Sequence, residues 1–347
     1  MIPLMLAGGF MKAMVRGVLA VALVAAVVVT TGLAQEPPEM DRIAFVIATG
    51  PVGGSYMQAG EAIAITISHP PGLGRCEGGG SCGPRGLIAT ARSSGGSVAN
   101  ALAVQARTAQ AALVQGDVLA AAMKGTGPFV KAGALQDLRV VARLHDEVMH
   151  VVVSPQSRIR RLADLRGRRI AIDASTTDTE ITARNLLAAA GVRFSSLTVR
   201  RLPAEQAAES LRARKVDAIL VMGVTPVRSL EPLFRRGQAR LVAVDNRTLQ
   251  RLVRGNALYA KASLPAGAYR SSRQVQALGV ASVWVVHRSQ DPAVVTQVLK
   301  AFWAPENRAD LEMRLGFASL IDARKAAVVG ALPLHEGAQR FYGARSP

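Results

Sequence analysis

The sequence has few aromatic residues and only two cysteines, and both shortages exclude classes of ligand. Phe, Trp and Tyr make up 4% of the 347 residues, whereas sugar-binding sites generally stack their ligand on aromatic rings. A metal site needs several ligands at set spacings, but the five histidines are scattered along the chain. We therefore expect no carbohydrate ligand, no metal and no cofactor.

Motifs of common enzyme classes are also missing. There is no H-E-x-x-H zinc motif and no recognisable pair of catalytic carboxylates, so we expect a protein that is not an enzyme. Lys and Arg (42) outnumber Asp and Glu (24), which gives a net charge of +18. Because these bases are spread out, without a recognition helix or an aromatic strip among them, nucleic acid is not an expected partner.

The N-terminus carries the pattern of an export signal. Lys12 and Arg16 precede an apolar run, residues 18–29, which is shorter than the roughly 20 residues that span a membrane. Small residues follow, as a signal peptidase requires. The pattern predicts a signal peptide over residues 1–34, cleaved after Ala34, and a periplasmic protein. An uncleaved membrane anchor is the alternative.

The two cysteines lie close together in the segment GRCEGGGSCGP. Five residues, three of them glycine, separate Cys76 from Cys82, so the intervening loop is able to close. Exported proteins meet oxidising conditions, and we predict one disulfide between these two residues.

Predicted strands and helices alternate along the rest of the chain, which indicates an α/β fold with mainly parallel sheets. The strands are expected at residues 43–48, 86–91, 111–115, 138–144, 149–154, 168–172, 198–202, 217–222, 239–244 and 278–286. The helices are expected at residues 55–68, 97–106, 117–125, 161–167, 181–191 and 204–215, and again over most of the chain after residue 291.

The length favours two sheets and two lobes. We predict that lobe 1 holds residues 41–153 and 277–347, and that lobe 2 holds residues 154–276. The chain would cross between the lobes at residues 158–165 and 274–286.

Loops rich in Gly, Ser and Thr follow four of the predicted strands. Ligands of open parallel sheets gather at the carboxyl ends of the strands, where helix N-termini offer free N–H groups and glycine allows close approach. Together, such loops predict a cleft for a small anion. The loops are residues 49–56, 93–100, 173–180 and 223–226.

Each loop also has a purely structural explanation. Gly and Ser are ordinary turn and cap residues, and Ser97 and Asp117 are candidate N-caps. Thr177 and Glu180 fit a T-x-x-E capping box. The first loop lacks both the G-K-[ST] and the G-x-G-x-x-G signatures, which disfavours a nucleotide.

In their order and spacing, several segments resemble the TAXI family of extracytoplasmic solute receptors, which serve TRAP-type transporters. The resemblance implies a two-lobed, type II periplasmic-binding-protein fold with a ligand cleft between the lobes. It also implies TRAP membrane permease subunits as partners and a glutamate-like amino acid or a dicarboxylate as ligand. The matching segments are residues 49–56, 93–100, 115–118, 149–169 and 333–342.

The resemblance and the strand-end loops together give a set of predicted ligand contacts. Those of lobe 1 are Thr49, Gly53, Gly54, Ser55, Tyr56, Ser94, Gly95, Gly96, Ser97, Asn100, Gln115 and Asp117. Those of lobe 2 are Ser175, Thr176, Thr177 and Thr225.

The third loop departs from the family pattern, because DASTTDT stands where relatives carry G-x-x-G-S-G-T. If Asp178 faces the cleft, it repels a dianion and favours a ligand with an ammonium group. If Asp178 faces solvent, it only complements the dipole of the first helical turn, and we favour this interpretation. Arg92 is either a clamp for a carboxylate or a solvated arginine, and we favour the latter.

These observations predict a receptor that captures a small organic anion or an amino acid for a transporter. The alternative is a periplasmic ligand sensor for a membrane signalling partner.

Overall fold

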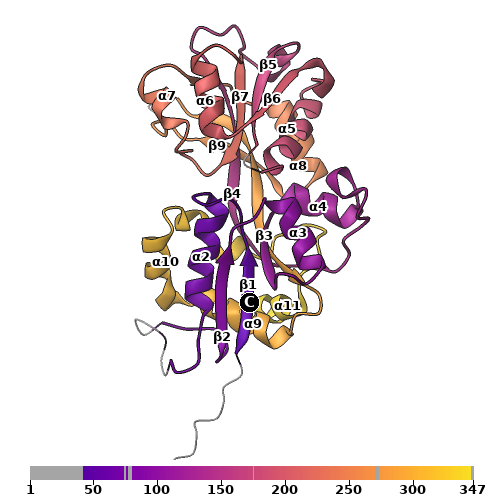
Figure 1. Ribbon diagram of the computed structural model, residues 1–347, viewed down its shortest axis with the longest axis vertical. Helices are drawn as coiled ribbons and strands as arrows, with labels where there is room; N and C mark the ends of the chain where they lie inside the picture. Colours follow the sequence, from indigo (N-terminus) through magenta and orange to yellow (C-terminus); the bar gives the residue numbers. More distant parts are fainter. Residues whose placement is uncertain (1–41, 74–75, 77–79, 175, 270–272, 345–347) are drawn as a thin grey trace, which may run out of the picture. The chain divides into compact units, whose positions relative to one another are not determined.

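A single hydrogen-bonded sheet of ten strands runs through the part of the chain that the computed structural model describes (Figure 1). The described residues are 42–73, 76, 80–174, 176–269 and 273–344. The main strand order is β2-β1-β3-β10-β4-β7-β5-β6, with β8 added to β4 and β9 added to β10. The strands are β1 (Ile43–Ala48), β2 (Leu87–Arg92), β3 (Ala111–Gln115), β4 (Leu138–Val153), β5 (Arg169–Asp173), β6 (Thr198–Leu202), β7 (Ala218–Gly223), β8 (Arg240–Leu241), β9 (Tyr259–Leu264) and β10 (Val275–His287).

The helices follow the strands in the alternating order that the sequence predicts. Those of the described residues are α2 (Ser55–Ile67), α3 (Ser97–Gln105), α4 (Gly116–Lys124), α5 (Asp178–Ala189), α6 (Ala204–Arg212), α7 (Glu231–Arg235), α8 (Asn246–Gly255), α9 (Pro292–Phe302), α10 (Arg308–Arg314) and α11 (Glu336–Gly343). None of them is long and apolar enough to cross a bilayer. The predicted signal peptide lies outside the described residues.

The continuous sheet corrects the expectation of two sheets. We predicted separate strands at residues 138–144 and 149–154, with His145, Asp146 and Glu147 between them. The structure has one strand, β4, because the backbone pairing continues through these residues: Asp146 pairs with Ala281 and Glu147 with Val280. Polar side chains in mid-strand therefore did not mark a break.

Two long strands join the parallel parts of the sheet. The β1–β2, β1–β3, β5–β6 and β5–β7 pairs are parallel, whereas β4 and β10 pair antiparallel with all their neighbours. β10 occupies the segment in which we expected one crossing, residues 274–286. The other expected crossing, residues 158–165, contains the 3-10 helix Leu162–Leu165, and β4 is the strand that lies between β10 and β7. The division into two lobes by residue number stays a prediction.

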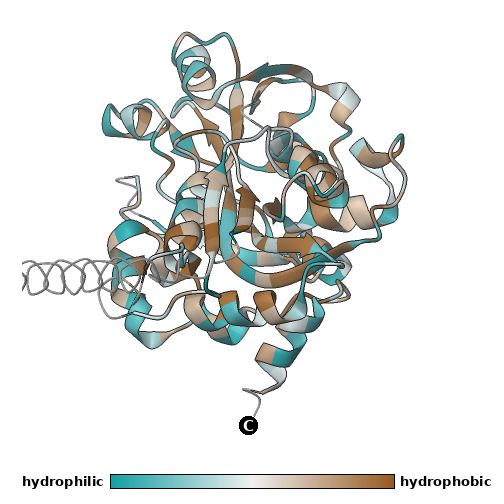
Figure 2. Cartoon of the chain, turned by 60° about the horizontal axis from the view of Figure 1, so that its bottom comes forward, coloured by the Kyte–Doolittle hydropathy of each residue, from teal (hydrophilic) through white to brown (hydrophobic). Residues whose placement is uncertain are grey.

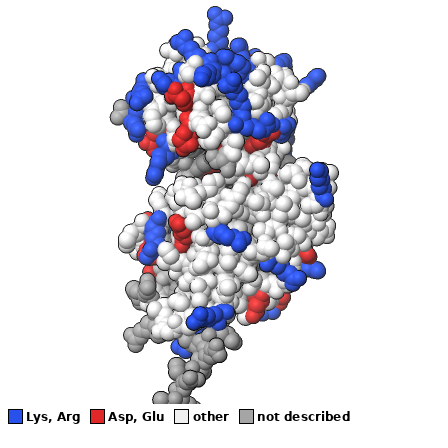
Figure 3. Space-filling model, viewed as in Figure 1, with Lys and Arg blue, Asp and Glu red and all other residues white. Residues whose placement is uncertain are grey.

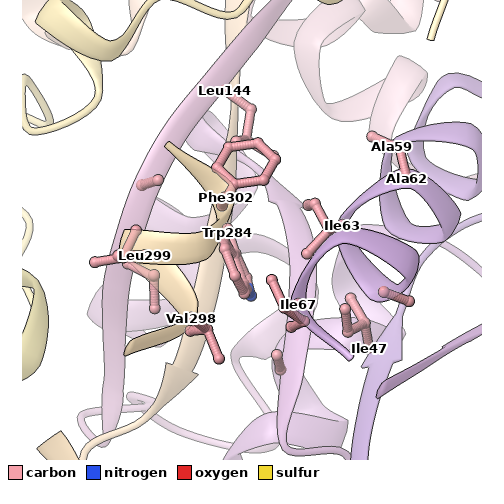
Figure 4. Packing of buried hydrophobic residues seen from close by; sticks show 14 of the residues in the cluster. Ile47, Ala59, Ala62, Ile63, Ile67, Leu144, Trp284, Val298, Leu299 and Phe302 are labelled. Carbon is pink, nitrogen blue, oxygen red and sulfur yellow. The ribbon is translucent and has the colours of Figure 1, made fainter. Parts of the chain in front are cut away.

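The first hydrophobic core lies between the sheet, α2 and α9. Trp284 of β10 is fully buried, and Ile63 and Ile67 of α2 approach it from one side while Leu299 of α9 approaches it from the other (Figure 4). Hydrophobic residues are concentrated along the central strands (Figure 2). At about 25 cal/mol per Å², burial of such side chains is the main stabilising contribution to this part of the chain.

A second core packs α5 and α8 against β5, β7 and β4, with Leu186, Ile172 and Leu220 at its centre. Met149 and Val151 of β4 belong to this core, whereas Leu144 of the same strand belongs to the first. The same strand thus stabilises both cores.

The structure confirms the disulfide between Cys76 and Cys82, whose Cα atoms are 5.6 Å apart. α7, α8 and β9 were not predicted from the sequence. α8 begins after Asp245, whose carboxylate accepts a hydrogen bond from Thr248 N–H at 2.9 Å, and its arginines obscured its apolar face. β8 has two residues instead of the six expected.

Candidate functional site

A cavity of about 930 Å³ opens where the ends of β1, β5 and β7 meet. Figure 3 shows a hollow between the upper and lower groups of elements, with Lys and Arg prominent above it. The loops after β1 and β7 line the cavity, together with single residues of β3, β4 and β5 and four residues of α6. The loop segments are residues 50–56 and 222–229.

The first glycine-rich loop lines the cavity as predicted. Gly54 N–H donates to Pro51 C=O at 3.0 Å, which closes the turn, and α2 begins at the next residue, Ser55. Gly53 has a φ of 83°, which glycine adopts without strain. No side chain caps α2, so its N-terminus faces the cavity through Ser55 and Tyr56. The Ser55 hydroxyl donates to the carboxylate of Glu147.

The second predicted loop, residues 93–100, contacts the start of α5 and does not line the cavity. Ser97, the first residue of α3, donates its backbone N–H to Asp178 Oδ2 at 3.0 Å and its hydroxyl to the same oxygen at 2.5 Å. Asp178 is 5% exposed and lines the cavity. The expectation that Asp178 faces solvent is therefore wrong, because its carboxylate occupies the positive end of α3.

Gly96 permits this contact between the two loops. Its φ is 94°, and a Cβ built on it would lie 2.7 Å from Thr176 Cβ. The predicted N-cap Ser97 is instead the first helical residue, and Gly96 is the cap. The capping box of Thr177 and Glu180 is also wrong, because Thr177 makes no capping bond and Glu180 accepts from Arg201 and Arg184.

A fully satisfied carboxylate, that of Asp117, lies behind the cavity. It accepts hydrogen bonds from Val118 N–H, Gln115 Nε2, Thr182 Oγ1 and Tyr259 OH at 2.7 to 2.9 Å. α4 begins at Gly116 with Gln115 as its N-cap residue, so the prediction of Asp117 as the cap is wrong. The network joins α4 to α5 and β9 and holds the Gln115 amide in place.

The floor of the cavity is acidic. Glu147, Asp173 and Asp178 line it and are each at most 9% exposed. Burial raises the pKa of Glu147 to about 7, against the hydrogen bond from Ser55, and the nearby carboxylates add to the rise. Burial likewise raises the pKa of Asp178 to about 6, although the bonds from Ser97 oppose it.

Arginines line the cavity as well, together with Glu205 and Glu209 of α6. Arg212, Arg228 and Arg236 line it, and Arg212 donates to Glu209 at 2.6 Å in an exposed ion pair. No group of three His, Cys, Asp or Glu side chains that could hold a metal ion occurs in the described part of the chain. The lining therefore offers both carboxyl groups as hydrogen-bond acceptors and guanidinium groups as donors.

Seven predicted contact residues line the cavity: Gly53, Gly54, Ser55, Tyr56, Gln115, Thr176 and Thr225. Eight do not: Thr49, Ser94, Gly95, Gly96, Ser97, Asn100, Asp117 and Thr177. Ser175 lies outside the described residues. The role of each in ligand binding stays a prediction.

Several of the eight residues that do not line the cavity form hydrogen bonds between the loops. Thr49 C=O accepts hydrogen bonds from the Ser94 hydroxyl at 3.1 Å and from Asn100 Nδ2 at 2.5 Å, so the first two loops lie side by side. Arg92 does not line the cavity, and its guanidinium donates to Thr108 C=O in an exposed position, as we favoured.

The sequence did not indicate Glu147, Arg228 and Arg236 as cavity residues, whereas Asp173 belongs to the predicted cleft loop 173–180. A signal for Glu147 was present, because an acidic side chain in the middle of a long apolar strand is unusual. The arginines follow β7 and α7 in segments that show no motif.

Comparison with solved structures places the fold among the solute-binding proteins. A TctC solute binding protein from Polaromonas is 17% identical, with 82% of this chain and 91% of that chain covered and a TM-score of 0.50. XAC2383 from Xanthomonas citri, bound to a chloride ion, is 14% identical, with 87% and 99% covered and a TM-score of 0.52. The periplasmic aliphatic sulphonate binding protein SsuA from Escherichia coli matches at 15% identity, with 87% and 92% covered and a TM-score of 0.43.

The predicted fold class is thereby confirmed: the chain has the α/β fold of the periplasmic binding proteins. Residues 47–343 match the model of the NMT1-like family, and the chain belongs to this family.

Proposed function

We propose that the protein is a periplasmic receptor that binds one small solute in the cavity and delivers it to a membrane transporter. The observation that carries this proposal is the cavity itself. It has a volume of about 930 Å³ and is lined by strand-end loops from both parallel parts of the sheet. Small-molecule sites typically occupy 300–1,000 Å³ and combine apolar walls with a few polar groups. The solute belongs to the small organic anions or amino acids.

The resemblance to TAXI receptors supports a TRAP-type permease as the membrane partner. A transport assay with the purified receptor and the permease subunits in vesicles tests this part. Uptake that requires the receptor supports it, whereas a receptor that binds solute without supporting uptake favours the sensor alternative.

Filling the cavity tests the binding site directly. Gln58 lines the cavity on the first turn of α2, so the bulky variant Gln58→Trp is expected to block the solute. Glu61→Trp is the matched control, because Glu61 is exposed on the same helix and does not line the cavity. We expect calorimetry to show 1:1 binding for the wild type and Glu61→Trp, and at least tenfold weaker binding for Gln58→Trp. Equal affinity in both variants would place the site elsewhere.

A further inference from the structure

Both helix N-termini predicted to bind a ligand anion already face carboxylates of the chain itself. At α2 the Ser55 hydroxyl donates to Glu147, and at α3 Ser97 donates to Asp178. The positive end of a helix is where a carboxylate ligand would gain most. Asp178 thus occupies the N-terminus of α3, and Glu147 occupies the Ser55 hydroxyl at the start of α2. The cavity floor therefore offers a ligand carboxylate fewer free donors than the glycine-rich loops alone would.

The side-chain amide of Gln115 has an oxygen without a hydrogen-bond donor in the described part of the chain. Gln115 is fully buried and lines the cavity, and its Nε2 donates to Asp117 Oδ1 at 2.8 Å and to Thr182 Oγ1 at 2.7 Å. Its Oε1 has no partner among the described residues. The amide has only one satisfactory orientation, because turning it over would set Oε1 against the Asp117 carboxylate, which is itself an acceptor. The atom left for a ligand is therefore an acceptor.

Two carboxyls of the floor, those of Glu147 and Asp178, lack a basic partner among the described residues. Glu147 and Asp178 form no ion pair with a Lys or Arg in the part of the chain that the structure describes. Charged side chains this deeply buried are normally paired. The unpaired oxygen of Gln115 needs a hydrogen-bond donor, and the two buried carboxyls need a cation. One cationic donor group on the ligand would satisfy both.

We propose that the ligand carries a protonated amino group, which binds against Glu147 and Gln115 Oε1 with Asp178 close by. This inference rests on the proposed receptor function and narrows its solute to amines and amino acids. A second, acidic end of the ligand would bind the arginines that line the cavity, Arg212, Arg228 and Arg236. The proposal excludes dicarboxylates without nitrogen as the ligand.

A competing arrangement is a protonated Glu147 that donates to a ligand carboxylate. The two arrangements predict opposite effects of pH on the affinity for the ligand. The groups that influence Glu147 are the Ser55 hydroxyl and the carboxyls of Asp117, Asp173 and Asp178, and Tyr56 lies beside it. None of them is basic, so a rise from pH 5 to pH 8 makes the floor more negative. An amine then binds more tightly, whereas a carboxylate held by protonated Glu147 binds more weakly.

Calorimetry with matched pairs of solutes tests the proposal. The pairs are L-glutamate with 2-oxoglutarate and L-alanine with pyruvate, in which an amino group replaces a keto group, and 4-aminobutyrate with succinate. Putrescine adds a probe without a carboxylate. We expect at least one amine to bind, its nitrogen-free partner to bind at least tenfold more weakly, and the affinity for the amine to rise between pH 5 and pH 8.

The variant Glu147→Gln removes the charge but keeps an acceptor for Ser55. It is expected to weaken amine binding by about tenfold to hundredfold, the loss of one charge-assisted hydrogen bond. Glu61→Gln, which removes an exposed carboxylate of α2, is expected to bind like the wild type. Circular dichroism checks that both variants fold.

The outcomes separate this inference from the receptor function. Equal or tighter binding of a nitrogen-free partner, affinity that falls with rising pH, or unchanged amine binding by Glu147→Gln would overturn the amino-group assignment and leave the receptor standing. Failure of every solute to bind would overturn both.

Discussion

Glu147 is 9% exposed and bears a carboxyl whose pKa burial raises to about 7. Since an exposed glutamate titrates near 4.5, the folded protein holds a proton on Glu147 that the unfolded chain has already lost. The native state without ligand is thus less stable at neutral pH than in mild acid, as far as this residue is concerned.

The pH dependence of stability tests this point. Because the folded pKa lies above the unfolded one, the contribution of Glu147 is fully present below pH 4.5 and is lost as the pH rises to about 7. The loss is at most about 3 kcal/mol, since one pKa unit corresponds to about 1.4 kcal/mol. We expect urea unfolding of the ligand-free protein to show this decrease between pH 5 and pH 8, and Glu147→Gln to reduce it. An equal slope in the variant would contradict the raised pKa.

At the scale of elements, the contact between the loop before α3 and the start of α5 sets the shape of the cavity. Gly96 has φ 94° and ψ −165°, a backbone region that is essentially restricted to glycine, and Thr176 leaves no room for a Cβ. Gly53 also has a positive φ, 83°, but nothing lies within 4 Å of its Cβ position.

This difference makes the two glycines a matched pair. Gly53→Ala is expected to cost about 1 kcal/mol of unfolding free energy, from backbone strain alone. Gly96→Ala is expected to cost at least about 2 kcal/mol, because the methyl group also collides with Thr176. The second change Thr176→Gly should recover part of the loss in Gly96→Ala and none in Gly53→Ala. Equal losses in both single variants, measured by urea denaturation, would show that the loops do not touch.

Periodicity predicts most of the helices and strands, because their apolar faces are continuous. β1, α2 and β3 were predicted within one residue of their observed ends. The apolar pattern failed to predict a continuous β4 across His145, Asp146 and Glu147. β10 pairs with Asp146 and Glu147 on one side, and β7 begins to pair on the other side only at Val148. The continuity of β4 depends on pairing with strands distant in sequence, which the local pattern of residues does not show.

The candidate site shows the same limit. Sequence analysis located the glycine-rich loops, because their spacing after strands has a local cause. It misplaced Asp178, because whether this side chain faces water or Ser97 depends on a segment 81 residues away. Glu147 became a candidate only when β4 brought it to Ser55, which is 92 residues distant in sequence.

At the scale of the whole molecule, β4 and β10 connect the two hydrophobic cores. Leu144 and Trp284 belong to the first core, whereas Met149 and Val280 on the same two strands belong to the second. Both cores depend on the same two strands. Unfolding of one core would therefore expose apolar side chains of β4 and β10 and weaken the other core. Since small cooperative units unfold in one step, shared strands favour a single transition.

Two optical probes distinguish one transition from two. Trp284 and Trp303 both belong to or pack against the first core, so tryptophan fluorescence reports on that core alone. Far-ultraviolet circular dichroism reports on the helices of both. We expect the two urea transitions to coincide in the ligand-free protein. A solute at 100 times its Kd should raise the unfolding free energy by about 2.7 kcal/mol in both signals equally. A fluorescence transition displaced from the dichroism transition would instead show that the second core unfolds independently, and β4 and β10 would then be a hinge between separately stable units.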